Sequence, residues 1–123
     1  MLKVDVKNLE SVVILSLQGQ VVTGETDNLR NAVHSLPKTS AVILDFLRVT
    51  TVDAHGLGVM LELRERTQAK GIRLELMNVS HPLRRILEIT RLDSVFSITS
   101  GVEFFPALPY RRRPSLTALK SCA

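Results

Sequence analysis

The sequence predicts a small α/β domain built on a mixed β-sheet. A chain of 123 residues, 45% of them hydrophobic, is long enough to bury one real core. Apolar segments with the period of a strand alternate with segments that have the period of a helix, which implies right-handed crossovers and a largely parallel sheet. The first two strand segments follow each other directly, so one antiparallel pair is expected at the start of the sheet.

Two strands are expected before the first helix. Residues 2–6 alternate between charged and apolar side chains, as a half-buried strand does. Residues 12–17 are almost all apolar and predict a stronger strand, while residues 7–11 suit a hairpin loop. This pair accounts for the antiparallel part of the sheet.

The first helix and the central strand come next. Thr23 or Thr26 can cap a helix that runs to about Ser35, ahead of Pro37. Its inward stripe is expected to contain four apolar residues, Leu29, Ala32, Val33 and Leu36. The nearly continuous apolar run over residues 41–46 predicts a strand buried in the middle of the sheet.

The second half of the pattern repeats helix and strand twice. We expect a loop over residues 47–55, a helix over residues 56–69 and a strand over residues 72–77. The inward stripe of this helix is expected to be Leu57, Met60 and Leu61. Ser80 can cap a third helix, and a short strand over residues 95–98 closes the order ββαβαβαβ. The side chains of the third helix expected to face the core are Leu83, Ile86, Leu87 and Ile89.

The net charge of +4 lies entirely in the C-terminal segment. Residues 1–105 contain twelve basic and twelve acidic side chains, whereas residues 106–123 contain four basic side chains, no acidic one and three prolines. We therefore expect a domain over residues 1–105 and a flexible basic tail over residues 106–123. The triplet Arg111–Arg113 could contact anionic lipid, nucleic acid or an acidic partner, and a solvated tail is the simpler interpretation.

Several classes of protein are disfavoured by composition. No apolar run approaches the roughly 20 residues that span a bilayer, and the first ten residues do not resemble a signal peptide. The single cysteine, Cys122, excludes an internal disulfide. Since the folded part carries no net charge, nucleic acid is not an expected partner. We expect a cytoplasmic protein without a transmembrane segment.

One short motif stands out at the start of the second helix. Gly56 and Gly58 flank Leu57, which predicts a tight turn with exposed N–H groups and a small surface that a partner can approach closely. A tight connection without a binding role is the alternative. The candidate partner-binding residues are Asp53, Ala54, His55, Gly56, Leu57 and Gly58.

Structural roles are favoured over chemical ones for the same residues. Asp53 could orient the imidazole of His55 for catalysis, but no Ser or Cys nucleophile lies in the motif, and helix capping is the simpler role of Asp53. His34, His55 and His81 lie on separate predicted elements, so no metal site is expected. No glycine-rich phosphate loop is present, and no cofactor is expected.

Residues 53–58 resemble the signature of STAS domains, the family of bacterial anti-sigma factor antagonists, in which Asp-Ser-Ser/Thr-Gly-Leu/Ile-Gly starts a helix. Residues 17–19, residues 77–80 and the helix after them match the family in the same order. The resemblance implies a mixed sheet of four or five strands with helices packed on one side. It also implies binding without turnover: family members bind an anti-sigma factor that is a serine kinase, and phosphorylation of the second Ser/Thr of the signature stops this binding.

The chain departs from the family at the position of the switch. His55 stands where the family has its phospho-acceptor, Ala54 replaces the preceding serine, and Gln20 and Val22 replace acidic residues. Histidine has no hydroxyl for a serine kinase to modify. We expect an antagonist-like protein that binds a kinase-type anti-sigma factor through residues 53–58, near the loop over residues 20–26. The alternatives are a STAS subunit of a lipid transporter that docks on its ATPase and, less favoured, a small enzyme using Asp53 and His55.

Overall fold

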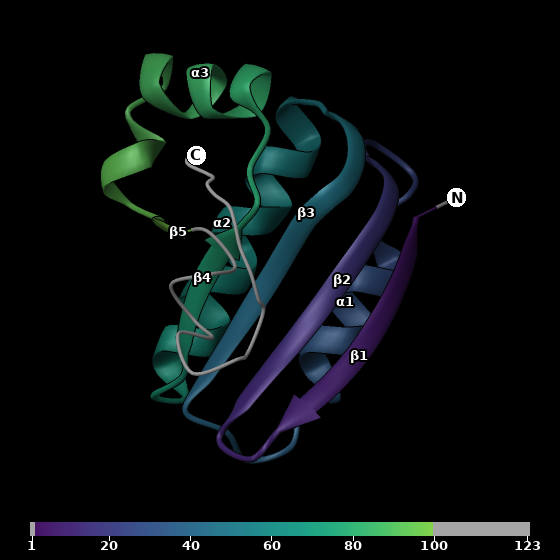
Figure 1. Ribbon diagram of the computed structural model, residues 1–123, viewed down its shortest axis with the longest axis vertical. Coiled ribbons are helices and arrows are strands. Elements are labelled where there is room, and N and C mark those ends of the chain that lie inside the picture. Colours follow the sequence, from purple (N-terminus) through teal and green to yellow (C-terminus); the bar gives the residue numbers. More distant parts are fainter. Residues whose placement is uncertain (1, 100–123) are drawn as a thin grey trace, which may run out of the picture.

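The protein forms a single five-stranded sheet with three helices, shown by a computed structural model that describes residues 2–99 (Figure 1). The elements follow the expected order: β1 Lys3–Leu9, β2 Val12–Val21, α1 Asp27–His34, β3 Ala41–Val52, α2 Ala54–Ala69, β4 Arg73–Met77, α3 His81–Ile89, a 3-10 turn Leu92–Ser94 and β5 Ser97–Thr99. The domain boundary expected after residue 105 and the tail expected over residues 106–123 lie outside the described residues.

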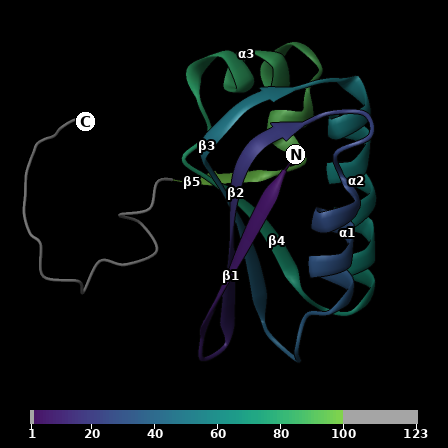
Figure 2. The ribbon, with the colours of Figure 1, turned by 90° about the vertical axis from the view of Figure 1, so that its right-hand side faces the viewer.

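The sheet is mixed, as the sequence predicts. Its strands lie in the order β1-β2-β3-β4-β5, with β1 antiparallel to β2 and the other neighbours parallel. Figure 2 shows α1 and α2 side by side on one face of the sheet, with α3 at its upper end. The expected arrangement of helices packed on one side is therefore confirmed.

The core lies between the sheet and the helices. Alternate residues of β2, β3 and β4 point toward it, and Leu29 and Val33 of α1 and Leu63 of α2 meet them. The residues of β2, β3 and β4 in this core are Val13, Leu15, Leu17, Val21, Val42, Leu44, Phe46, Leu74 and Leu76. The intervening residues Ile14, Ile43 and Met77 form a smaller cluster of their own.

Two expected loops are shorter than the sequence pattern indicates. β1 extends to Leu9, so the hairpin turn contains only Glu10 and Ser11, with Glu10 in the left-handed region at φ 51°. The prediction of a loop over residues 47–55 is wrong, because β3 continues to Val52. Its second half, residues 47–52, pairs with the end of β2 through two register shifts. Arg48, Thr50 and Thr51 interrupt the apolar run there, so the pattern does not indicate a strand.

The inward faces of α2 and α3 differ in part from the prediction. Helix α2 begins at Ala54, and its buried residues are Gly56, Val59, Met60, Leu63 and Thr67, so Leu57 and Leu61 lie at the edge of the stripe. On α3 only Leu83 and Leu87 are buried, while Ile86 is 37% and Ile89 74% exposed. A helix of nine residues lying at one end of the sheet presents a narrow stripe to the core, and two isoleucines remain outside it.

The central position of β3 gives the first prediction. Leu44 is fully buried between the sheet and the helices, so Leu44→Ala should leave a cavity and lower the free energy of unfolding by about 2–5 kcal/mol. Leu47→Ala on the same strand is the matched control, because Leu47 is 68% exposed and should cost less than about 0.5 kcal/mol. Chemical denaturation of both variants measures the difference, and equal costs would contradict the assigned faces of β3.

Candidate functional site

Asp53 joins the start of α2 to the loop that follows β2. Its Oδ1 accepts a hydrogen bond from the backbone N–H of Gly56 at 2.8 Å, which makes Asp53 the N-cap of α2. Its Oδ2 accepts from both the backbone N–H and the Oγ1 hydroxyl of Thr23, each at 3.1 Å. The capping role expected for Asp53 is confirmed. Thr23 is not the helix cap that the sequence allowed, since α1 begins after Thr26.

Hydrogen bonding also sets the charge state of this carboxylate. The backbone N–H of Gly56, followed by that of Thr23, holds the pKa of Asp53 below its ordinary value, because both bonds favour the charged form. The nearby His55 adds a smaller effect in the same direction. Asp53 is therefore a carboxylate near neutral pH, with both oxygens engaged.

Gly56 is required by a close approach of two backbones. A Cβ at this position would lie 1.9 Å from the carbonyl oxygen of Val21, the last residue of β2. The same carbonyl accepts a hydrogen bond from the backbone N–H of Asp53 at 3.3 Å. The first turn of α2 therefore packs directly on the end of β2, and only glycine fits there.

Gly58 has no such structural reason. A Cβ at this position would meet no atom of the described part of the chain within 4 Å, and the residue is exposed. Glycine inside a helix costs about 1 kcal/mol relative to alanine. The two glycines of the motif therefore differ in kind, since Gly56 serves packing and Gly58 leaves an open, small surface on α2.

The exposed part of the motif is formed by Ala54, His55 and Gly58, while Leu57 lies partly buried against the core. The bond from Thr23 to Asp53 brings residues 20–26, the end of β2 and the loop after it, beside this surface. Gly24 in this loop has φ 85°, and Gln20 and Thr23 are exposed. The structure thus brings together the two segments that the sequence placed on either side of β3.

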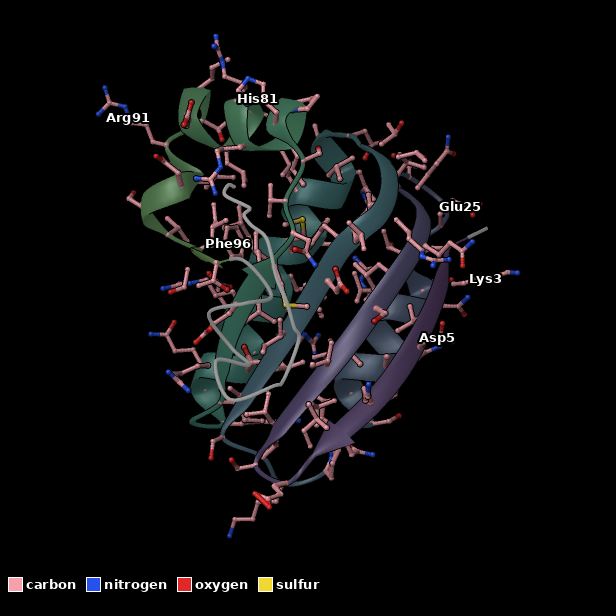
Figure 3. All side chains as sticks on the ribbon, viewed as in Figure 1. Lys3, Asp5, Glu25, His81, Arg91 and Phe96 are labelled. Atoms are coloured by element: carbon pink, nitrogen blue, oxygen red, sulfur yellow. The ribbon has the colours of Figure 1, made fainter. Side chains whose placement is uncertain are left out.

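The structure does not form a catalytic pair from Asp53 and His55. Both carboxylate oxygens of Asp53 accept from Gly56 and Thr23, and within residues 2–99 no hydrogen bond joins Asp53 to His55. His34 lies at the end of α1 and His81 at the start of α3, where Figure 3 labels it. In this part of the chain no group of three or more His, Cys, Asp or Glu side chains is placed to hold a metal ion.

The structure also contains a groove that the sequence does not predict. It measures about 180 Å³ and lies between the second half of β3 and α3. Its lining is Phe46, Val49, Thr50, Thr51, Val52, Ser80, Pro82, Leu83 and Ile86. The exposure of Ile86 and the extension of β3 create this groove, and neither is visible in the apolar pattern.

Comparison with known proteins identifies the fold family. A family model of the STAS domain matches residues 3–108. The chain belongs to the STAS domain family. The anti-sigma-B factor antagonist of Bacillus subtilis is 28% identical over 103 residues, which cover 83% of this chain and 94% of that protein. The expected identification as an anti-sigma factor antagonist-like STAS domain is confirmed at this level.

Solved structures agree on the fold. An anti-sigma factor antagonist from Mycobacterium paratuberculosis matches with a TM-score of 0.74 and 18% identity, over 85% of this chain and 90% of that one. A sulfate transporter family protein from Wolinella succinogenes matches with a TM-score of 0.64 and 26% identity, over 76% and 80% of the two chains. The STAS domain also matches 18% of the length of a larger protein, Mglu, at 30% identity and a TM-score of 0.55. Among the helices within residues 2–99, none is long and apolar enough to cross a membrane.

The contrast between the two glycines can be measured directly. Gly56→Ala should lower the free energy of unfolding by about 1–3 kcal/mol, because the new methyl group collides with the Val21 carbonyl. Gly58→Ala should raise it by about 0.5–1 kcal/mol, because the helix gains a better former at no steric cost. Denaturant unfolding of both variants checks the signs, and destabilisation by Gly58→Ala would contradict the open surface.

The bonds of Asp53 predict a pH dependence of stability. The pKa of Asp53 is lower in the folded state than in the unfolded one, so its stabilising contribution is present above about pH 4 and is lost as the pH falls through the folded-state pKa. Asp53→Asn turns an amide toward the Thr23 N–H and should lower the Tm at pH 7. Below the folded-state pKa of Asp53, the difference from the wild type should shrink.

Thermal unfolding from pH 7 down to pH 3 measures this difference. Glu65→Gln is the matched control, because Glu65 is exposed on α2 and makes no hydrogen bond or ion pair with any residue in 2–99. Its Tm should stay near the wild-type value throughout. A Tm deficit of Asp53→Asn that is constant across this range would show that the carboxylate charge plays no part.

Proposed function

We propose that this STAS domain is an anti-sigma factor antagonist that binds a kinase-type anti-sigma factor through residues 53–58 and the loop over residues 20–26. The open surface at Gly58 carries the proposal. A glycine that no contact among residues 2–99 requires, on an exposed helix turn, allows a partner to approach the helix backbone closely.

The bonds of Asp53 support reversible docking at this surface. They hold the loop at Thr23 and the first turn of α2 together before any partner arrives. Little ordering is then needed on binding, which lowers the entropic cost of association. The mechanism is the exchange of binding partners, with no chemical turnover and no cofactor, in the cytoplasm where an anti-sigma factor acts.

His55 makes this antagonist insensitive to a serine kinase at the signature. Phosphorylation of a hydroxyl adds a charge of about −1.5 to −2, which repels an acidic surface or breaks a dry contact. Imidazole has no hydroxyl to accept that group, and it carries no negative charge. Control then lies in the abundance of the protein or in the state of its partner.

The proposal is tested with the anti-sigma kinase partner and ATP. Wild-type protein should bind the partner equally well with and without ATP, and mass spectrometry should find no phosphate on it. His55→Ser restores a hydroxyl at the signature and should lose binding when ATP is added, with phosphate at position 55. Phosphoserine or phosphothreonine elsewhere that releases wild-type protein would contradict this account.

Two further variants separate binding from phosphorylation. Gly58→Arg places a bulky charged side chain on the open surface and should abolish binding without ATP. Glu65→Arg is its control on the exposed side of the same helix and should bind normally. Normal binding by Gly58→Arg would move the contact surface away from the motif.

A second function is favoured by one comparison. The match to a sulfate transporter family protein supports a STAS domain that works with a transporter. Within that class, the alternative expected from the sequence is a STAS subunit of a membrane lipid transporter. In that case residues 53–58 dock permanently on the transporter ATPase, and no anti-sigma factor binds before or after the His55→Ser change. Co-purification with an ATPase distinguishes the two.

A further inference from the structure

The free edge of β1 is the longest exposed strand edge in the described part of the chain. β1 lies at one end of the strand order and pairs only with β2, whereas the opposite edge strand, β5, has three residues. Figure 1 shows β1 as the outermost ribbon of the sheet, and Figure 2 views the molecule from this side. An edge of this length presents unpaired N–H and C=O groups to another strand.

The hairpin determines which residues present those groups. Leu9 and Val12 face each other across a two-residue turn, so they exchange the closely spaced pair of hydrogen bonds. From Leu9 back along β1, every second residue forms backbone hydrogen bonds with β2. The residues between them direct their N–H and C=O groups away from β2. The outward residues are Val4, Val6 and Asn8, and no group within residues 2–99 bonds to their outer side.

The side chains of β1 favour one pairing register. Lys3, Asp5 and Lys7 alternate in charge along the strand, and none of them forms an ion pair within residues 2–99 (Figure 3 labels Lys3 and Asp5). Val6, between Asp5 and Lys7, is 54% exposed. If a second copy pairs antiparallel with Val6 opposite Val6, Asp5 of each chain lies opposite Lys7 of the other.

Other symmetric registers are less favourable. If the twofold axis lies at Asp5, Asp5 of one copy lies opposite Asp5 of the other, and Lys3 lies opposite Lys7. Both are pairs of like charges, which are unfavourable. Centring on Val4 pairs Lys3 with Asp5, but it also needs the carbonyl of Leu2, which already accepts from Asn28 Nδ2 at 2.9 Å. The Val6 register uses all of β1 and disturbs no existing bond.

We propose that β1 is a self-association edge through which two copies pair antiparallel about a twofold axis at Val6. Three residue pairs, Val4 with Asn8, Val6 with Val6 and Asn8 with Val4, each exchange two backbone hydrogen bonds. Asp5 and Lys7 form two opposite-charge pairs at the positions where side chains lie closest. The two five-stranded sheets become one continuous sheet. Because these charges are exposed, the dimer is favoured at low salt.

Charge reversal on the full chain tests the register. Asp5→Lys or Lys7→Asp alone places like charges at both pairs and should weaken dimerisation by at least about tenfold in sedimentation equilibrium at low salt. An equimolar mixture of the two variants restores opposite charges at both pairs and should form a heterodimer with the wild-type affinity. The double variant Asp5→Lys/Lys7→Asp should again form a homodimer.

Lys3→Asp is the matched control, because in the Val6 register Lys3 lies opposite Leu9 and not opposite a charge. It should dimerise like the wild type. The three side chains altered here, Lys3, Asp5 and Lys7, are exposed on β1, and circular dichroism of each variant verifies the fold. A wild-type chain that stays monomeric at low salt would overturn the proposal. So would dimers that survive both single reversals, or a Lys3→Asp defect as large as that of Lys7→Asp.

Discussion

The parallel pairing of β2 with β3 up to Val21 and Val52 is the constraint on which the candidate site depends. It places Asp53 directly beside the end of β2, where its backbone N–H reaches the Val21 carbonyl. From there one carboxylate oxygen reaches the first turn of α2 and the other reaches Thr23. Without the two register shifts in β3, the strand would end elsewhere and Asp53 could not bridge the two segments.

The same constraint explains why the motif contains two glycines of different use. Packing the start of α2 on Val21 leaves no room for a side chain at Gly56. Gly58 lies about half a turn further along the helix and faces open space. Packing within the fold therefore requires the glycine at position 56, whereas the glycine at position 58 is the one on which the proposed binding surface depends.

Much of the fold could be predicted from the sequence, because period and apolar content determine which segments are buried. The run over residues 41–46 is central, and Asp53 caps a helix, as expected from local pattern alone. The polar continuation of β3 could not be predicted, because it depends on pairing with a strand about 30 residues earlier. The partner of Asp53 was missed for the same reason: Thr23 looks like a helix cap when only its neighbours are considered.

The exposed isoleucines of α3 show a second limit of sequence reasoning. Helical spacing assigns Ile86 and Ile89 to the apolar side together with Leu83 and Leu87, but which part of that side is covered depends on where the helix lies on the sheet. β1 shows the converse, since its alternation predicts a strand but not that the strand forms an edge.

The edge of β1 and the surface around residues 53–58 have no residue in common. In the proposed dimer, pairing through β1 therefore leaves residues 53–58 of both copies outside the β1 contact, so the two proposals are compatible.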